Sequence, residues 1–309
     1  MQTLKIINHP LTILIVLGFI IIEARHSRKE HKELYDTKDS EGSFLMGFYW
    51  LLSNFLSNAI LFGALQTAWK FRIFDLGNRW PGWILAFFLS DFSAYWYHRL
   101  SHEVNWFWAT HLVHHSSRKM NISTTFRLPV LSQLTGQFLF WMWIPALGMN
   151  PIMTFIFFKL CYLYQTWLHT ETINKLPRII EYFFNTPSHH RVHHGSNPEY
   201  LDKNHGAILI IWDRIFSTFC EETIKPKYGL TTDPESINPF MINFIEYRTL
   251  FEKAFKAGSL RQAIKYFIMP PGWSHNGETL TVKEIRKNAA LCVADDLSSV
   301  SLNEQLAMQ

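Results

Sequence analysis

Residues 186–195 read TPSHHRVHHG, and this stretch decides the fold because three of its histidines follow the spacing His-x-x-His-His: His190, His193 and His194. Positions three and four apart lie on one face of an α-helix, so a helix here would gather the three imidazoles into one claw. Thr186 followed by Pro187 is typical of a helix start, since proline fits the first helical position. We therefore predict a short helix that presents several metal ligands.

Two more histidine clusters lie upstream in the chain. HRLSH and HLVHH place histidines at i, i+4 and at i, i+3, i+4, respectively: His98, His102, His111, His114 and His115. His102 and His111 are nine residues apart, so these two clusters would be about half a turn out of phase on an unbroken helix. We therefore expect a bend within VNWFWAT, residues 104–110. Eight imidazoles exceed the needs of one ion, which predicts two neighbouring metal ions. Imidazole suits Fe, Zn, Cu and Ni alike.

Two other metal-site designs do not fit. His102 and Glu103 begin like the zinc-protease motif H-E-x-x-H, but Trp106 stands where the second histidine would be. Carboxylate-bridged di-iron bundles use paired Glu-x-x-His motifs, and the example here, Glu23 to His26, lies far from the clusters.

The composition is that of a membrane protein. The 309 residues are 48% hydrophobic and only 17% charged, against roughly 25% charged in soluble domains. The net charge is +4, and the basic residues do not interleave with aromatics, which excludes nucleic acid as a partner. Apolar runs cover residues 10–22, 44–69, 82–97, 128–147 and 151–168. We predict an all-α, multi-pass membrane bundle of about four to five spans carrying a helical histidine-box domain for two metals.

The order of these runs places the three clusters on one membrane face. The loop after the first run is basic and lies on that same face, so the positive-inside rule makes it cytoplasmic, in the endoplasmic reticulum or a bacterial inner membrane. We divide the chain into an N-terminal membrane helix and basic loop (1–43), a catalytic membrane domain (44–220), and an amphipathic surface segment with a tail (221–309). Lys159 inside the last run leaves two alternatives: a polar bundle interior, or a hairpin that does not fully span.

Three further residues are candidates for supporting roles. Asp91 shares a helical stripe with His98 and His102, where it would fix an imidazole by a hydrogen bond; a helix–helix polar contact is the alternative. Glu103 would orient a ligand or contact a reductant such as a pterin, against the alternative of a solvated charge. His189 has no place in the His-x-x-His-His spacing, so we expect it in the substrate or cofactor pocket.

The clusters HRLSH, HLVHHSS and TPSHHRVHHG, with NHGAILIIWDRIFSTF, resemble the fatty acid hydroxylase superfamily, which includes the sterol desaturases. HEVNWFWATHLVHHSS and YQTWLHTETIN are most similar to its ether-lipid-cleaving branch, the alkylglycerol monooxygenases. The resemblance implies a membrane-bound, non-haem di-iron oxygenase with the eight clustered histidines as ligands. It also implies His169 as a ninth ligand, against the alternative of a helix-end histidine at the interface. His205 stands where that branch carries tyrosine, so we do not expect it to bind metal.

The implied reaction is the hydroxylation of a lipid C–H bond with O2. If the resemblance to the ether-lipid branch holds, the substrate is an ether lipid and tetrahydrobiopterin is the reductant. If only the superfamily resemblance holds, the substrate is a sterol, sphingolipid or fatty acyl chain that is hydroxylated or desaturated, with electrons from a separate cytochrome or ferredoxin. A non-enzymatic membrane carrier of haem or metal is an alternative of another class, but haem ligands usually oppose each other within spans, whereas these histidines form triplets at helix ends.

Overall fold

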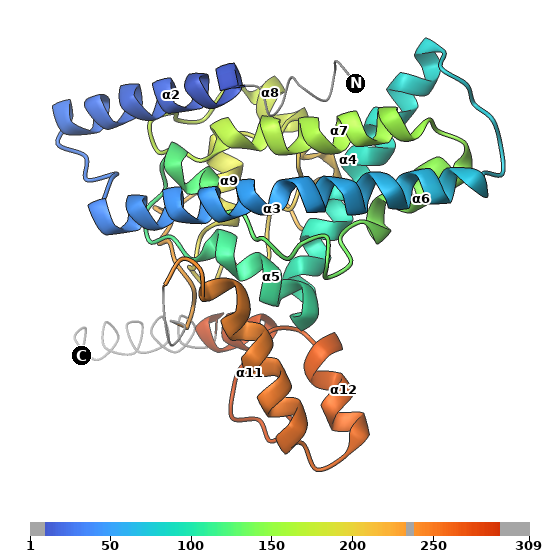
Figure 1. Cartoon of the computed structure of the whole chain (residues 1–309). Coiled ribbons are helices and arrows are strands. Elements are labelled where there is room, and N and C mark those ends of the chain that lie inside the picture. Colours follow the sequence, from blue (N-terminus) through green and yellow to red (C-terminus); the bar gives the residue numbers. More distant parts are fainter. Residues whose placement is uncertain (1–9, 233–237, 291–309) are drawn as a thin grey trace, which may run out of the picture.

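The computed structural model describes residues 10–232 and 238–290, and within these ranges the chain is helical with no named strand (Figure 1). This confirms the all-α prediction. The α-helices are α2 (Pro10–Lys29), α3 (Thr37–Lys70), α4 (Trp80–Glu103), α5 (Asn105–His115), α6 (Leu139–Leu147), α7 (Pro151–Gln165), α8 (Arg178–Phe183), α9 (Pro187–His193), α10 (Ile211–Ile215), α11 (Ile242–Lys256) and α12 (Leu260–Ile268). Two 3₁₀ turns, η1 (Ile122–Phe126) and η2 (Thr166–Leu168), are also present, and residues 282–290 are helical as well.

The long helices form the main body of the molecule. α3 packs against α6 and α7, while α4 crosses obliquely and packs against α5, α6 and α7 (Figure 1). Their shared core contains large side chains from each of these helices, including Leu65, Tyr97, Trp141 and Phe158. Burial of apolar surface of this size is the main force that holds the helices together.

α3 is the one helix in the described residues that is long and apolar enough to cross a bilayer. Only 17% of its most apolar window is buried within the protein. Its outer face instead exposes Phe48, Leu52 and Phe55, the last at 87%. Contiguous exposed apolar surface of this kind marks a site of lipid or protein contact, whereas the core helix of a soluble protein would be covered.

The predicted helix over residues 128–147 is wrong in its first half. Residues 130–138 form successive turns, and helix α6 begins only at Leu139. Pro129 precedes the turns, and Gly136 adopts a positive φ of 102°, which breaks a helix. α6 has 9 residues and α7 has 15, so both are shorter than the ~20 residues that a full span needs.

The predicted bend between the first two histidine clusters is confirmed. Val104 separates α4 from α5 and has extended backbone angles, with φ −129° and ψ 120°. Asn105 fixes the new direction, because its backbone N–H donates to Met269 and its side chain donates to the carbonyl of Tyr266. The bend therefore depends on the C-terminal helices that pack outside it.

The amphipathic segment predicted within residues 245–268 is two helices, α11 and α12. They separate at Ala257–Ser259, where the Ser259 hydroxyl caps α12 by accepting the Gln262 N–H. α11 packs against α5 and α12. The predicted C-terminal tail lies outside the described residues.

Candidate metal centre

Nine buried histidines converge in two adjacent groups. The first group has five members and the second has four: His98, His102, His111, His115 and His193; and His114, His169, His190 and His194. Within each group, one ring nitrogen from every member lies within 4.8 Å of the corresponding nitrogen of every other. The structure thus brings together all nine histidines that the sequence analysis named as ligands, including His169.

The second group forms a closed ring of four nitrogens. The Nε2 atoms of His114 and His169 lie 3.2 Å apart, and those of His169 and His190 lie 3.0 Å apart. His194 closes the ring at 3.1 Å from both His190 and His114. The centre of such a square, flat or puckered, is about 2 Å from each corner, which matches a metal–imidazole bond of roughly 2.0–2.1 Å.

The first group has the same kind of spacing. Nε2 of His111 lies 3.0 Å from Nε2 of His98 and 3.2 Å from Nε2 of His115. The Nε2 atoms of His102 and His193 are buried and have no hydrogen-bond partner among the described residues. An unpartnered buried nitrogen is costly, and a cation at the centre of the group would satisfy both.

Main-chain carbonyls lie within hydrogen-bonding distance of the Nδ1 atoms of several of these rings, on the side away from Nε2. The Nδ1 atoms of His98 and His193 donate to the carbonyls of His205 and Lys203, at 2.8 and 3.0 Å. Those of His169 and His114 face the carbonyls of Gln165 and Arg127, at 2.9 and 3.4 Å. A proton held at Nδ1 leaves the Nε2 lone pair free, as a metal ligand requires.

The protonation state of the rings also suits a cation. Burial removes water from the charged form and lowers the pKa of six imidazoles well below its usual value, and neighbouring imidazoles lower it further: His111, His114, His115, His190, His193 and His194. Burial lowers the pKa of His169 to about 4. All seven are therefore neutral at pH 7, the form that binds metal. The donor set and its geometry fit two metal ions.

The contact expected between Asp91 and an imidazole is not formed. The Asp91 carboxylate is fully buried and accepts the backbone N–H groups of Ile208 and Leu209, at 2.9 and 3.2 Å, and the indole N–H of Trp212 at 2.9 Å. All three donors belong to the segment after the third cluster, and the Cys161 thiol on α7 also donates to Oδ1, at 3.9 Å. Asp91 thus fixes this segment against α4 and makes no hydrogen bond to an imidazole among the described residues.

Glu103 is also placed differently from its expected role. Its carboxylate pairs with Arg99 one turn earlier, at 2.8 Å, and its side chain is 37% exposed. A cavity of about 600 Å³ does reach the centre, between α5, α11 and residues 271–285. It is lined by His102, His115 and His193 of the first group and by His194 of the second. Glu103 is not among the described residues that line it.

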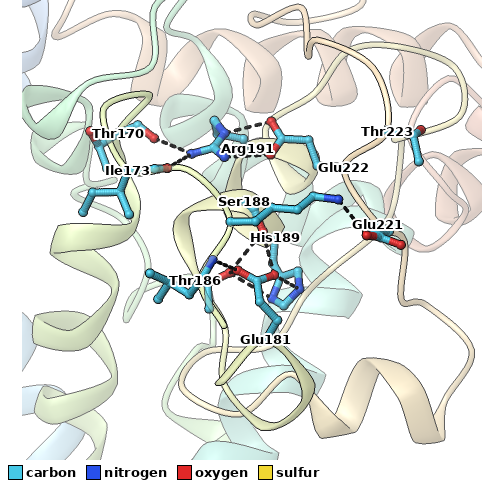
Figure 2. Close-up of polar contacts among 12 residues, drawn as sticks. Thr170, Ile173, Glu181, Thr186, Ser188, His189, Arg191, Glu221, Glu222 and Thr223 are labelled. Atoms are coloured by element: carbon cyan, nitrogen blue, oxygen red, sulfur yellow. Dashed lines mark hydrogen bonds and ion pairs between the residues drawn. The ribbon is translucent and has the colours of Figure 1, made fainter. Parts of the chain in front are cut away.

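His189 pairs with a carboxylate of the preceding helix, α8. Figure 2 shows its ring against the carboxylate of Glu181, with Nε2 2.9 Å from Oε2. Glu181 also accepts the hydroxyls of Thr186 and Ser188, both at 2.8 Å. Burial alone would raise the pKa of Glu181, but His189 and these donors outweigh it and lower the pKa to about 2. His189 therefore anchors the start of α9, and it does not line the cavity described above.

Arg191 anchors the other side of the same helix. Its guanidinium makes a two-pronged ion pair with Glu222, at 2.8 and 2.7 Å (Figure 2). It also donates to the carbonyls of Thr170 and Ile173, at 3.0 and 2.7 Å. Since Thr170 follows His169 directly, the hydrogen bond from Arg191 to the Thr170 carbonyl fixes the third cluster relative to the ninth histidine. The two-pronged ion pair with Glu222 holds the guanidinium in place for this contact.

Two carboxylates near the centre were not identified from the sequence. Asp202 lies 3.5 Å from Nδ1 of His102. Asp213 is buried and accepts the backbone N–H groups of His205 and Gly206, both at 2.7 Å. Burial raises the pKa of Asp213 to about 6. Asp213 lies within the quoted stretch NHGAILIIWDRIFSTF, so its place in that motif was the available signal.

His205 belongs to neither group. It is fully buried, and neither ring nitrogen has a hydrogen-bond partner in the described part of the chain. Its ring centroid lies 5.1 Å from that of His102 and 5.7 Å from those of His98 and His193. His205 thus lies beside the first group without being one of its members, and the expectation that it does not bind metal stays a prediction.

Comparison with known proteins shows which proteins this chain resembles. Residues 83–218 match the family model described as fatty acid hydroxylase. This range includes most of α4, all of α5 and α9, and all nine histidines of the two groups. The relatives with the higher sequence identity belong to one kind of enzyme: they are alkylglycerol monooxygenases.

The enzyme of Danio rerio is 35% identical over 265 residues, which cover 84% of this chain and 56% of that protein. The enzyme of Homo sapiens is 38% identical over 217 residues, 70% of this chain and 48% of that protein. An ornithine lipid hydroxylase of Rhizobium tropici is 28% identical over 157 residues, 50% of this chain and 47% of that protein. The resemblance stated from the sequence is thus confirmed. The chain spans about half the length of the curated relatives it matches.

No solved structure matches this chain at a significant level.

Proposed function

We propose that the protein is a membrane-bound non-haem di-iron monooxygenase that hydroxylates a lipid C–H bond with O2. The main observation behind the proposal is the pair of adjacent histidine groups, one of five and one of four members, inside the part of the chain that matches the fatty acid hydroxylase family. Histidine clusters in this family are consistent with iron. Because alkylglycerol monooxygenases are the similar proteins, an ether lipid is the favoured substrate, ahead of a sterol or fatty acyl chain.

The proposed placement in the membrane follows from the sequence and from the exposed face of α3. In this arrangement four to five segments enter the bilayer, and the histidine groups lie at its cytoplasmic face, in the endoplasmic reticulum or a bacterial inner membrane. Residues 1–43 anchor the chain, 44–220 form the catalytic domain, and 221–309 form a surface segment. α11 supports this division, because it packs outside α5 and walls the cavity beside the centre.

Two bound irons would supply the activation of O2 and the oxidation of the C–H bond. The protein's own residues would orient the ligands, limit the access of water and admit a co-substrate. Nδ1–H bonds to main-chain carbonyls orient the rings, and burial keeps bulk water from the centre. The cavity of about 600 Å³ gives a small co-substrate access from the side of α11. Tetrahydrobiopterin, or electrons from a separate cytochrome or ferredoxin, would be delivered there.

Oxidation of an ether lipid has a distinctive product. A hydroxyl placed on the carbon next to the ether oxygen gives a hemiacetal, which breaks into an aldehyde and an alcohol. We would incubate the purified full chain with a 1-O-alkylglycerol, ¹⁸O2 and a reduced pterin, and trap the aldehyde at once. Labelled aldehyde supports the proposal, and a hydroxylated sterol or acyl chain in its place would move the substrate assignment to the wider superfamily.

Metal analysis tests the centre without turnover. We expect about two irons per chain and no haem absorption band, since the clustered rings leave no pair opposed across a porphyrin. His169→Ala should lose about one iron, because it leaves only three nitrogens in the second group. His102→Ala should keep more metal, because four nitrogens remain in the first. His26→Ala, an exposed histidine outside both groups, is the matched control. One iron held equally by all variants would contradict the two-ion centre.

A further inference from the structure

A second cavity lies away from the histidine groups, between the long helices. It has a volume of about 150 Å³ and is lined by residues of α2, α3, η1, η2, α7 and the turns before α6. More than half of the lining residues carry a polar group, although most of the lining surface is apolar. The polar lining residues are Asn54, Ser57, Asn58, Thr125, Ser132, Gln133, Gln137, Lys159, Tyr162 and Thr166. Neither the reaction nor the metal ligands account for such a set.

Lys159 provides the charge of this cavity. It is 8% exposed, and among the described residues it has no hydrogen bond and no ion pair. Its ammonium lies 5.5 and 5.7 Å from the ring centroids of Phe155 and Phe158, which offer only a weak cation–π contact. No aspartate or glutamate is among the lining residues. A buried ammonium without a counter-ion is costly, so this geometry calls for an anion from outside the chain.

The neighbouring side chains have hydrogen-bonding capacity left over. The Gln133 amide N–H donates to Gln137, and the Gln137 amide N–H donates to the Tyr162 hydroxyl, both at 2.7 Å. Because the Tyr162 oxygen accepts from Gln137, its proton remains available to a ligand. The Gln133 carbonyl oxygen is buried without a partner in the described structure. The Lys159 ammonium and the Tyr162 hydroxyl offer donors to the acceptor oxygens of a ligand, and the Gln133 carbonyl offers one acceptor, as for a ligand hydroxyl.

The cavity adjoins the segment that carries one of the metal-centre histidines. Thr166 is among its lining residues, and the carbonyl of Gln165 beside it accepts from Nδ1 of His169. Lys159 is two turns earlier, at about 10 Å from Thr166 along the helix at 1.5 Å per residue. A lipid whose head is bound at Lys159 would therefore lie beside the same helical segment that leads to His169.

We propose that this cavity binds the acidic head of a lipid, a phosphate or carboxylate, through Lys159 and the Tyr162 hydroxyl. The assignment of that lipid as substrate rests on the proposed function; the binding site itself does not. A choline head is disfavoured relative to an acidic one, because its quaternary ammonium adds a second positive charge beside a phosphate bound to Lys159. The occupant is thus a negatively charged lipid with acceptor oxygens.

Spin-labelled lipids test this site in the holoprotein. The full chain is reconstituted in phosphatidylcholine nanodiscs with trace spin-labelled phosphatidic acid, stearic acid or phosphatidylcholine, and the protein-immobilised fraction of each is measured. We expect both acidic lipids to be preferred over phosphatidylcholine by about tenfold, the equivalent of one charge-assisted hydrogen bond. Lys159→Met should abolish the preference, and Lys70→Met, the same change at an exposed lysine, should leave it intact.

Two further variants keep the test decisive if Lys159→Met is poorly folded. Lys159→Arg should retain the preference, and Tyr162→Phe should reduce it about threefold through the loss of one neutral hydrogen bond. Equal immobilisation of acidic and choline lipids by the wild type would overturn the proposal. So would displacement by inorganic phosphate, since a free anion would then be the ligand. Iron content is measured on the same samples, so a failed metal centre and a failed lipid site are told apart.

Discussion

Replacing Asp91 by asparagine tests what holds the segment behind the metal centre. Oδ2 accepts two N–H groups, from Leu209 and Trp212, and Oδ1 accepts the N–H of Ile208 and, at 3.9 Å, the Cys161 thiol. The asparagine side chain has only one acceptor oxygen, so at least one buried N–H loses its partner. An unsatisfied buried donor costs about 1–3 kcal/mol. We therefore expect Asp91→Asn to weaken the local structure by about 2 kcal/mol, while leaving the fold intact.

The assay is hydrogen exchange of the backbone amides in residues 204–213, followed by mass spectrometry. A loss of 2 kcal/mol corresponds to exchange that is about thirtyfold faster. Ser90→Ala is the matched control: its hydroxyl is buried next to Asp91 but has no hydrogen-bond partner in the described chain, so its removal should change little. Unchanged exchange in Asp91→Asn would show that the carboxylate does not hold this segment, and the argument would be refuted.

Three other perturbations follow from the structure. Gly148→Ala should destabilise the protein by about 2–4 kcal/mol and lower the midpoint of thermal unfolding, because the residue has φ 118° and a Cβ would lie 2.4 Å from the Phe74 carbonyl oxygen. Glu181 has its folded-state pKa lowered to about 2 from 4.5, so its stabilising effect is complete above pH 4.5 and is lost as the pH falls from there toward 2; Glu181→Gln should flatten the acid-unfolding curve in that window. Asp202→Asn should weaken iron binding by about tenfold, measured by competition with a chelator, because a carboxylate 3.5 Å from Nδ1 of His102 makes that ring a better ligand.

The local spacing of the histidines made most of the centre predictable. In α4, α5 and α9, ligands three and four residues apart share a helix face whatever the tertiary structure, so each claw could be inferred separately. The phase difference between His102 and His111 required a bend, and Val104 provides it. The start of α9 at Pro187, with Thr186 at the preceding N-cap position, also followed from local backbone preferences.

What the sequence did not predict depends on contacts between distant segments. Asp91 shares a helical stripe with the histidines, but the N–H groups it binds belong to residues more than 110 positions later in the chain. Glu103 follows the first cluster, yet Arg99 one turn earlier neutralises it. The run at 128–138 contains no charge and resembles a helix in composition. Its serine, threonine and glutamine side chains instead bond to one another and to nearby carbonyls, which stabilises turns.

The use of peptide carbonyls to orient the rings has a consequence for how such a protein can diverge. A carbonyl is present at every position whatever amino acid the codon specifies, so substitutions at Lys203, Gln165 or Arg127 leave the acceptor in place as long as the backbone path survives. Selection on the centre then acts on chain geometry more than on the identity of the residues behind it. The sequence around the imidazoles is free to adapt to new lipids without disturbing the oxidation chemistry.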